Sequence, residues 1–261
     1  MQALVTALPR SFRTWFSRTL RRAGYQLINL QKFHAFDGLH TVHAPRFKED
    51  PRFRAAYDRA MQATHGVDQR TEWRVHIGLW AASVAARAAG DFVECGVNSG
   101  VLSTAILSYL DWPRLEKTFY LVDTFGGPDL SQLSEAEIAS GHAIILQDAI
   151  ERGAYVTDLE RVRGNYAEWP RIEIVQGRVP EILPAVGTQS VAFLHLDMNC
   201  AYPEAAALRH FWPSISPGGV VLCDDYSYSG FEAQGRAIDE VVAEVGARIV
   251  TLPTGQGMIV K

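Results

Sequence analysis

The sequence predicts a doubly wound α/β fold built on a seven-stranded, mostly parallel sheet. Apolar strand-like runs alternate with helical segments from about residue 92 onward, a pattern typical of parallel sheets with crossover helices. A glycine-rich turn follows the first of these runs, and the last two runs are close together in the sequence. The length of 261 residues fits one large domain of this class with additional segments.

Seven short apolar segments are the expected strands. They span residues 92–95, 118–123, 172–176, 191–197, 219–224, 248–252 and 258–261. Helices are expected between them at 99–109, 180–183, 203–212 and 231–245, and within one long polar connection at 134–140 and 158–166. The close spacing of the last two strands predicts that the sheet ends in an antiparallel, hairpin-like pair.

The residues before the sheet are expected to form an arm and a helical extension rather than an independent domain. This extension covers residues 1–69, with a loop and a helix at 46–65. The domain itself is expected to span residues 70–261 and to open with a helix at 70–89, where apolar residues recur at helical spacing. Residues 126–171 are too many for a simple crossover connection, so we expect a lid over the site.

The composition is that of a globular protein. Hydrophobic residues make up 48% of the chain and charged residues 21%, and the chain is long enough for a sizeable core. The formal net charge of −4 gives no global indication of nucleic-acid binding. The three cysteines are far apart, so neither a zinc site nor a disulfide framework is expected. Because the sequence has no signal-peptide or transmembrane pattern, we expect a cytoplasmic protein.

Residues 1–32 combine basic and aromatic side chains. Six arginines and lysines precede the first acidic residue, Asp37. Two interpretations of this amphipathic pattern remain open: weak contact with a membrane surface, or packing on the domain or on a second subunit. The second is favoured, and we expect a homo-oligomer. Equal co-sedimentation with liposomes with and without residues 1–32 would remove the membrane interpretation.

A glycine-rich turn follows the first expected strand. Its spacing, Glu94-x-Gly96-x-x-x-Gly100, differs from the Gly-x-Gly-x-x-Gly that holds a pyrophosphate. Gly96 allows a tight turn, and an acid before the turn repels a phosphate but suits a cationic amino group. Asp123 ends the second expected strand, where a carboxylate can accept hydrogen bonds from ribose hydroxyls. An amino acid joined to a ribose without phosphate describes S-adenosylmethionine.

Three aspartates end the fourth and fifth expected strands. Asp197 ends the fourth, and Asp224 and Asp225 end the fifth. Both strand ends should open on the same side of the sheet as Gly96. Converging carboxylates repel one another unless a cation joins them, so they predict a site for Mg²⁺ or Mn²⁺. The alternative is that one aspartate caps a helix and another faces solvent.

Five stretches of the sequence resemble the macrocin O-methyltransferase family. These class I, Rossmann-like enzymes tailor antibiotics by methylating sugar hydroxyls with S-adenosylmethionine and Mg²⁺. The stretches are residues 92–100, 120–127 (YLVDTFGG), 175–184 (VQGRVPEILP), 194–203 (LHLDMNCAYP) and 217–226 (PGGVVLCDDY). The resemblance covers about residues 70–260, and its last two stretches are its most specific part.

The resemblance implies roles for particular positions. Glu94, Gly96 and Gly100 would contact the methionine part of the cofactor, and Asp123 would contact its ribose. The full set of cofactor candidates is Glu94, Gly96, Ser99, Gly100, Asp123, Thr124, Phe125, Gly177 and Arg178, and the metal candidates are Asp197, Asp224 and Asp225.

Asn199 departs from the family pattern. The family usually has a second aspartate at this position, proposed as the general base, and an amide cannot accept a proton at neutral pH. Asn199 can still hydrogen-bond the acceptor. Candidates for the base are His142 in the lid, His195 and Tyr226, or water acting on a hydroxyl that the metal has acidified. For His195, a buried structural role is the favoured interpretation.

The expected function is metal-assisted, S-adenosylmethionine-dependent methylation of a hydroxyl on a sugar or another polyhydroxylated small molecule, as in natural-product tailoring. One alternative is a nucleotide-dependent oxidoreductase or epimerase, which the glycine spacing disfavours. The other is a cofactor-binding protein of the same fold with lapsed or different chemistry, which the asparagine at position 199 suggests. Nucleic acid is not an expected partner, because the only dense basic stretch is the N-terminal arm.

Overall fold

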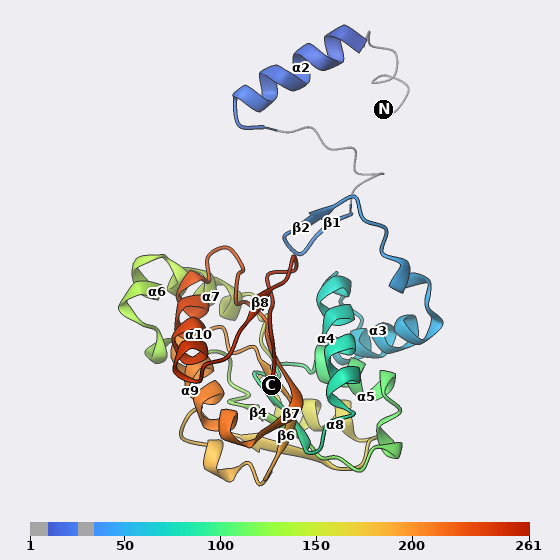
Figure 1. Ribbon diagram of the computed structural model, residues 1–261, viewed down its shortest axis with the longest axis vertical. Coiled ribbons are helices and arrows are strands. Elements are labelled where there is room, and N and C mark those ends of the chain that lie inside the picture. Colours follow the sequence, from blue (N-terminus) through green and yellow to red (C-terminus); the bar gives the residue numbers. More distant parts are fainter. Residues whose placement is uncertain (1–9, 26–33) are drawn as a thin grey trace. The chain divides into compact units, whose positions relative to one another are not determined.

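The computed structural model describes residues 10–25 and 34–261 of the chain (Figure 1). Its internal contacts divide the chain into two units, Met1–Ala44 and Pro45–Lys261, which are described separately. Residues 1–9 and 26–32 of the basic segment, whose two interpretations remain open, lie outside the described residues.

The first unit contains a helix and a small antiparallel hairpin in its described residues. They are α2 (Arg10–Arg22), β1 (His34–Phe36) and β2 (Leu39–Thr41). Phe12, Trp15 and Phe16 of α2 are exposed. The hairpin was not predicted, although Asp37 and Gly38 at its turn, both with positive φ, are a characteristic sequence signal for a two-residue hairpin loop.

The second unit is built on a seven-stranded sheet in the order β5-β4-β3-β6-β7-β9-β8. Its neighbouring strands are parallel except where β9 pairs with β7 and with β8. The strands are β3 (Asp91–Cys95), β4 (Phe119–Asp123), β5 (Ile172–Gln176), β6 (Val191–Leu196), β7 (Ile215–Cys223), β8 (Val250–Thr251) and β9 (Gly257–Val260). The predicted seven-stranded fold with an antiparallel end is therefore confirmed.

The strand order reverses at β3, because β4 lies on one side of it and β6 on the other. In open α/β sheets, ligands bind beyond the carboxyl ends of the strands at such a switch point. The topology thus directs attention to the ends of β3, β4 and β6.

Helices cover both faces of the sheet (Figure 1). Side chains alternate between the faces: Phe92 packs with residues of α3, α4 and α5, whereas Val93 packs with residues of α9 and α10. The helices are α3 (Pro51–Ala63), α4 (Glu72–Ala85), α5 (Val101–Tyr109), α9 (Ala201–Phe211) and α10 (Glu232–Glu244). The short 3-10 helices are η1 (Arg46–Glu49), η2 (Trp112–Arg114), η3 (Leu130–Gln132), η4 (Leu183–Ala185) and η5 (Trp212–Ser214).

Three helices occupy the insertion predicted at residues 126–171. They are α6 (Glu135–Ala139), α7 (His142–Glu151) and α8 (Leu159–Tyr166). The first and third were predicted, whereas α7 was not. Ser134 and Glu137 form a capping box that starts α6. Tyr166 of α8 is buried in the main core, so this end of the insertion packs into the helical layer.

Two predicted elements differ in the structure. The helix expected at residues 180–183 is a turn, and η4 follows it. Pro180 and Pro184 lack N–H groups, so regular α-helical bonding cannot run through this segment. The strand expected at residues 248–252 is reduced to the two exposed residues of β8. Among the described residues, no helix has the length and apolar character needed to cross a membrane.

Candidate active site

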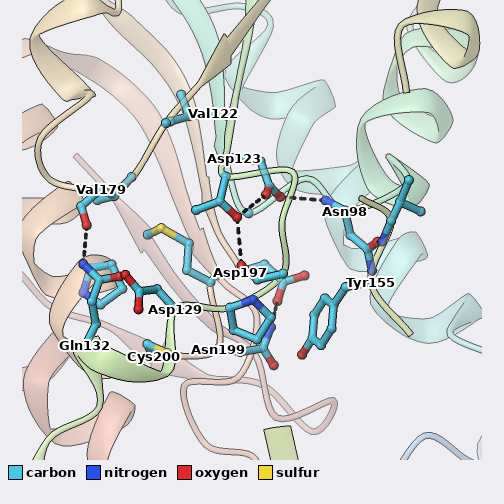
Figure 2. Close-up of a pocket in the computed structure, with 18 residues that line it drawn as sticks. Asn98, Val122, Asp123, Asp129, Gln132, Tyr155, Val179, Asp197, Asn199 and Cys200 are labelled. Atoms are coloured by element: carbon cyan, nitrogen blue, oxygen red, sulfur yellow. Dashed lines mark hydrogen bonds between the residues drawn. The ribbon is translucent and has the colours of Figure 1, made fainter. Parts of the chain in front are cut away.

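A pocket lies beyond the carboxyl ends of β3, β4 and β6 (Figure 2). It has an open volume of about 690 Å³, part of which is continuous with solvent. Its lining comes from the turn after β3, the ends of β4 and β6, the segment after β5, and the insertion. The pocket therefore lies at the switch point of the sheet, where open α/β folds bind their ligands.

Gly96 brings the turn after β3 against the end of β6. Its φ is +89°, and a Cβ at this position would lie 1.9 Å from the backbone carbonyl oxygen of Asp197. Gly100, also with φ +89°, precedes α5, and a Cβ there would lie 2.0 Å from the hydroxyl of Tyr166. Only glycine suits these positions, and the close approach at Gly96 places the turn directly beside Asp197.

Asp123 ends β4 and closes the same turn. Its Oδ2 accepts the backbone N–H groups of Val97 and Asn98 at 2.7 and 2.9 Å, and its Oδ1 accepts the N–H of Phe125 at 2.7 Å. Asp123 lines the pocket, as its predicted contact with a ribose requires. Both carboxylate oxygens already accept backbone N–H groups, so a ribose hydroxyl would share or replace one of these donors.

Asn98 joins the turn to the insertion. Its Nδ2 donates to the carbonyl oxygen of Ala154 at 3.0 Å, and its Oδ1 accepts the N–H of Val156 at 2.9 Å. These bonds hold the intervening Tyr155 in the pocket lining. Neither Asn98 nor Tyr155 was predicted. Asn98 has φ +51°, a conformation in which asparagine is enriched.

The charge of the pocket is negative. Asp123, Asp129 and Asp197 belong to its lining, and none of the described lining residues is basic. Arg178, predicted to contact adenosine, lies outside the lining and pairs with Asp129, with Nε and Oδ2 3.1 Å apart. A lining of this kind fits a ligand with sulfonium and ammonium groups and opposes a pyrophosphate. The residues present therefore fit S-adenosylmethionine.

The predicted site residues fall into two groups. Those that line the pocket are Gly96, Asp123, Thr124, Gly177, Asp197 and Asn199. Those outside its lining are Glu94, Ser99, Gly100, Phe125, His142, Arg178, His195, Asp224, Asp225 and Tyr226.

The structure brings Asp197, Asp224 and Asp225 together, and we call these three residues the aspartate cluster. One carboxylate oxygen from each lies within 4.8 Å of the others. Burial raises the pKa of Asp197 well above its usual range, and the charges of Asp224 and Asp225 raise it further. Asp197 is the member that reaches the pocket.

Protein groups already bind the carboxylates of the aspartate cluster. Nη1 of Arg74 lies 3.0 Å from Oδ1 of Asp225 and also pairs with Oδ2 of Asp224. Gln256 donates through Nε2 to Oδ1 of Asp224 at 2.8 Å. Burial by itself raises the pKa of Asp224, but Arg74 and hydrogen bonding outweigh it and hold the pKa below its usual range. Neither Arg74 nor Gln256 was predicted as a site residue.

The donor set does not fit a resident divalent cation. Three converging carboxylates are what such an ion needs, but both oxygens of Asp224 already have protein donors, one of which is the charged Arg74. A cation would have to displace these groups or lie beside a like charge. A bound metal ion therefore stays a prediction, and this arrangement does not support it.

His195 lies beneath the aspartate cluster. Its Nδ1 is 2.9 Å from Oε1 of Glu94, and its Nε2 is 3.8 Å from Oδ1 of Asp224. Burial lowers the pKa of His195, but the carboxylates of Asp224 and Glu94 outweigh this effect and raise the pKa to about 10. A general base must be unprotonated, so His195 does not suit that role at neutral pH. Glu94, predicted to contact the cofactor, is buried and contacts His195 through Oε1.

Glu204 of α9 supports the loop after β6. Its Oε1 accepts the backbone N–H groups of Met198 and Asn199 at 2.9 and 3.1 Å, and also the side-chain amide of Gln234 at 2.9 Å. Asn199 has φ +58° and donates through Nδ2 to Oδ1 of Asp197 at 3.2 Å. The buried Glu204 thus fixes the backbone that presents Asn199 and Asp197. It was not predicted.

Two buried side chains of the insertion hold the same loop from the other side. Glu137 accepts the N–H of Ala201 at 2.8 Å, and Nε2 of His142 lies 2.8 Å from the carbonyl oxygen of Asn199. His142 was a candidate base, but it is only 1% exposed and lies outside the pocket lining. It therefore acts on the backbone of Asn199 rather than on a ligand in the pocket.

Tyr226, the third candidate base, also lies outside the pocket lining. Its hydroxyl donates to Oδ1 of Asp239 on α10 at 2.6 Å. Burial and this hydrogen bond together raise the pKa of Tyr226 to about 12. None of the three candidate bases is therefore placed to take a proton in the pocket.

Residues 93–226, about half of the chain, match a family described as a methyltransferase domain. Among curated proteins, the chain is similar to the 8-demethyl-8-(2,3-dimethoxy-alpha-L-rhamnosyl)-tetracenomycin-C 4'-O-methyltransferase of Streptomyces olivaceus. The two are 28% identical over 149 residues, and the match covers 53% of each chain. It is also 28% identical over 147 residues to the demethyldecarbamoylnovobiocin O-methyltransferase of Streptomyces niveus, covering 52% of this chain and 53% of that one. The chain thus matches about half the length of these curated relatives.

Solved structures share the fold. The O-methyltransferase NovP superposes with a TM-score of 0.60 at 22% identity, covering 72% of this chain and 79% of that one. The calicheamicin methyltransferase CalS11 superposes with a TM-score of 0.55 at 14% identity, covering 90% of this chain and 98% of that one. At these identities the likeness shows the architecture, and the chemistry has to be argued from the pocket.

Proposed function

Because the chain belongs to the methyltransferase-domain family that matches residues 93–226, we propose that it is an S-adenosylmethionine-dependent O-methyltransferase. Its substrate is a hydroxyl of a sugar or another polyhydroxylated small molecule. The observation that carries the proposal is the pocket at the switch point of the sheet, whose described lining holds three carboxylates and no basic residue. Such a lining attracts a sulfonium and an ammonium group.

The cofactor would lie across the carboxyl ends of β3 and β4. Gly96 would lie against its methionine part. Asp123 would accept hydrogen bonds from the ribose, and Thr124 and Gly177 would border the adenine. Glu94, Ser99, Gly100, Phe125 and Arg178 lie outside the pocket lining, so in this proposal they shape the turn and the rim.

The bound cofactor supplies an electrophilic methyl group, which the acceptor oxygen takes while the electrons of the broken carbon–sulfur bond stay on sulfur, giving S-adenosylhomocysteine. The chain mainly supplies alignment for this displacement. The buried contacts of Glu204 and His142 hold the loop that carries Asp197 and Asn199. Tyr155 of the insertion adds to the pocket lining and helps to exclude water.

Asp197 is the member of the aspartate cluster that reaches the pocket, and we place the acceptor hydroxyl against it. Its carboxylate accepts the hydrogen bond of this hydroxyl, and the proton then leaves to solvent. Asn199 cannot take the proton, but its amide orients Asp197 and offers a hydrogen bond to the acceptor. Metal assistance has no part in this proposal, because Arg74 and Gln256 already bind Asp224.

The choice of a hydroxylated small molecule rests on the relatives. One is a 4'-O-methyltransferase of a rhamnosyl-tetracenomycin, and another is a mycinamicin III 3''-O-methyltransferase of Micromonospora griseorubida, 24% identical over 144 residues, covering 52% of this chain and 55% of that one. A role in natural-product tailoring, a cytoplasmic location, a homo-oligomeric state and membrane contact by the N-terminal arm remain predictions.

Methyl transfer itself tests the proposal. The full-length protein is incubated with methyl-labelled S-adenosylmethionine and a panel of glycosides with free hydroxyls, and the label is expected in an alkali-stable methyl ether. Asp197→Asn is expected to lower kcat by about 100-fold or more, with little effect on S-adenosylhomocysteine binding. The exposed Glu116, outside the pocket lining, provides the control, and Glu116→Gln is expected to behave like the wild type.

Three results would contradict parts of the proposal. A wild-type rate for Asp197→Asn would remove Asp197 from the reaction. Cofactor binding without transfer to any acceptor of a broad panel would favour lapsed or different chemistry. Hydride transfer with a nicotinamide cofactor would favour an oxidoreductase.

A further inference from the structure

We propose that Arg74 is the built-in cation of the aspartate cluster and holds the place that a divalent metal ion would otherwise take. Converging carboxylates repel one another unless a positive charge lies near them. A guanidinium group supplies such a charge and can bind two carboxylates at once. The cluster is therefore balanced by the chain itself and has low affinity for divalent cations.

The position of the guanidinium carries the inference. Nη1 of Arg74 contacts carboxylate oxygens of both Asp224 and Asp225. The three side chains are only 12%, 14% and 10% exposed, respectively, so little water separates the charges. Cζ of Arg74 also lies 4.8 Å from the ring centroid of Tyr228, close enough for a cation–π contact. The guanidinium thus lies between two carboxylates and an aromatic ring.

The backbone that carries Arg74 is held in place. Arg74 is near the start of α4, where the ring of Trp73 packs edge-on against Phe47 with centroids 4.7 Å apart. Glu72, the first residue of α4, pairs with Lys48 of η1. These contacts on both neighbours of Arg74 fix the start of the helix, so the guanidinium is directed at the cluster by the fold.

Gln256 binds the oxygen of Asp224 that Arg74 does not contact. Its Oε1 accepts the hydroxyl of Thr254 at 2.8 Å, which orients the amide so that Nε2 donates to Asp224 at 2.8 Å. Both oxygens of Asp224 therefore receive protein donors, one neutral and one charged. A divalent ion would have to remove both donors and would meet the repulsion of Arg74.

Manganese binding to the full-length protein tests this inference, with free Mn²⁺ followed by its electron paramagnetic resonance signal. Arg74→Gln is expected to bind one Mn²⁺ about tenfold or more tightly than the wild type, because the guanidinium that contacts Asp224 and Asp225 is gone and only the more distant imidazole of His195 remains near Asp224. Adding Asp224→Asn is expected to remove the gain. The exposed Arg87, just beyond α4, provides the matched control, and Arg87→Gln is expected to behave like the wild type.

Equal or weaker Mn²⁺ binding by a folded Arg74→Gln variant would overturn the proposal. If that variant does not fold, Mn²⁺ binding by the wild-type protein provides the test. Micromolar binding of one Mn²⁺ that Asp224→Asn abolishes would overturn the proposal, and no binding up to millimolar Mn²⁺ would support it. Binding of S-adenosylhomocysteine, measured on the same samples, reports on the proposed function separately, because the cation measurement requires no methyl transfer.

Discussion

Nδ1 of His195 lies 2.9 Å from Oε1 of Glu94, and both side chains are only 3% exposed. The two residues are also direct neighbours in the register of β3 and β6, so the pair links the two strands on either side of the switch point. Removing the imidazole would leave a buried carboxylate without its partner. We predict that His195→Leu lowers the free energy of unfolding by about 3 kcal/mol, measured by urea denaturation.

The double variant Glu94→Gln/His195→Leu is the control for this prediction. It replaces the buried carboxylate of Glu94, which the single variant leaves without a partner, so it should recover part of the lost stability. A His195→Leu protein within about 0.5 kcal/mol of the wild type would show that the pair contributes little.

Gly96 and Gly66 provide a comparison between two glycines with similar, positive φ angles. Their φ angles are +89° and +82°, but a Cβ at Gly96 would lie 1.9 Å from the carbonyl oxygen of Asp197, whereas a Cβ at Gly66 meets nothing within 4 Å. We predict that Gly66→Ala costs about 1–2 kcal/mol of stability from its backbone conformation alone. Gly96→Ala should cost clearly more and weaken S-adenosylhomocysteine binding at least about tenfold. Thermal unfolding and calorimetry check both values, and equal losses for the two variants would contradict the close approach at Gly96.

Glu204 should make stability depend on pH. Burial and, to a smaller extent, the negative charge of Asp225 raise its pKa to about 8. In the unfolded chain this carboxyl loses its proton near 4.5, whereas the native protein keeps the proton until about pH 8. The native state therefore binds more protons in this window, and stability falls as pH rises through it.

The variant Glu204→Gln separates this effect from other titrations. Glutamine keeps an oxygen that can accept the N–H groups of Met198 and Asn199 but does not ionise. We predict that the wild type loses on the order of a few kcal/mol between pH 5 and pH 8 relative to this variant. Parallel curves of melting temperature against pH would contradict the raised pKa.

The fold and the cofactor turn could be predicted because they depend on local patterns. Continuous apolar runs such as residues 220–223 (VVLC) indicate buried parallel strands, and the glycine spacing from Gly96 to Gly100 indicates a turn at the switch point. Three aspartates at strand ends have to converge once the strand order is known. These inferences need no knowledge of how distant segments pack.

The missed residues act across long sequence distances. Arg74 reaches Asp224 over 150 positions, and Gln256 reaches the same carboxylate from the last part of the chain. Each is a single polar residue in an otherwise ordinary segment, so no spacing identifies its partner. For the same reason, the acids could be read as metal ligands from the sequence, whereas only the structure shows an arginine among them. Glu204 and the backbone contact of His142 were also missed, because these bonds are to backbone atoms of the loop after β6.

Titration calorimetry of the full-length protein with S-adenosylhomocysteine, with NAD as the comparison ligand and EDTA present throughout, tests the central claim most directly. The account predicts stoichiometric binding of S-adenosylhomocysteine with a micromolar Kd and no binding of NAD, both in the presence of the chelator. A folded protein that binds NAD and not S-adenosylhomocysteine would contradict the account.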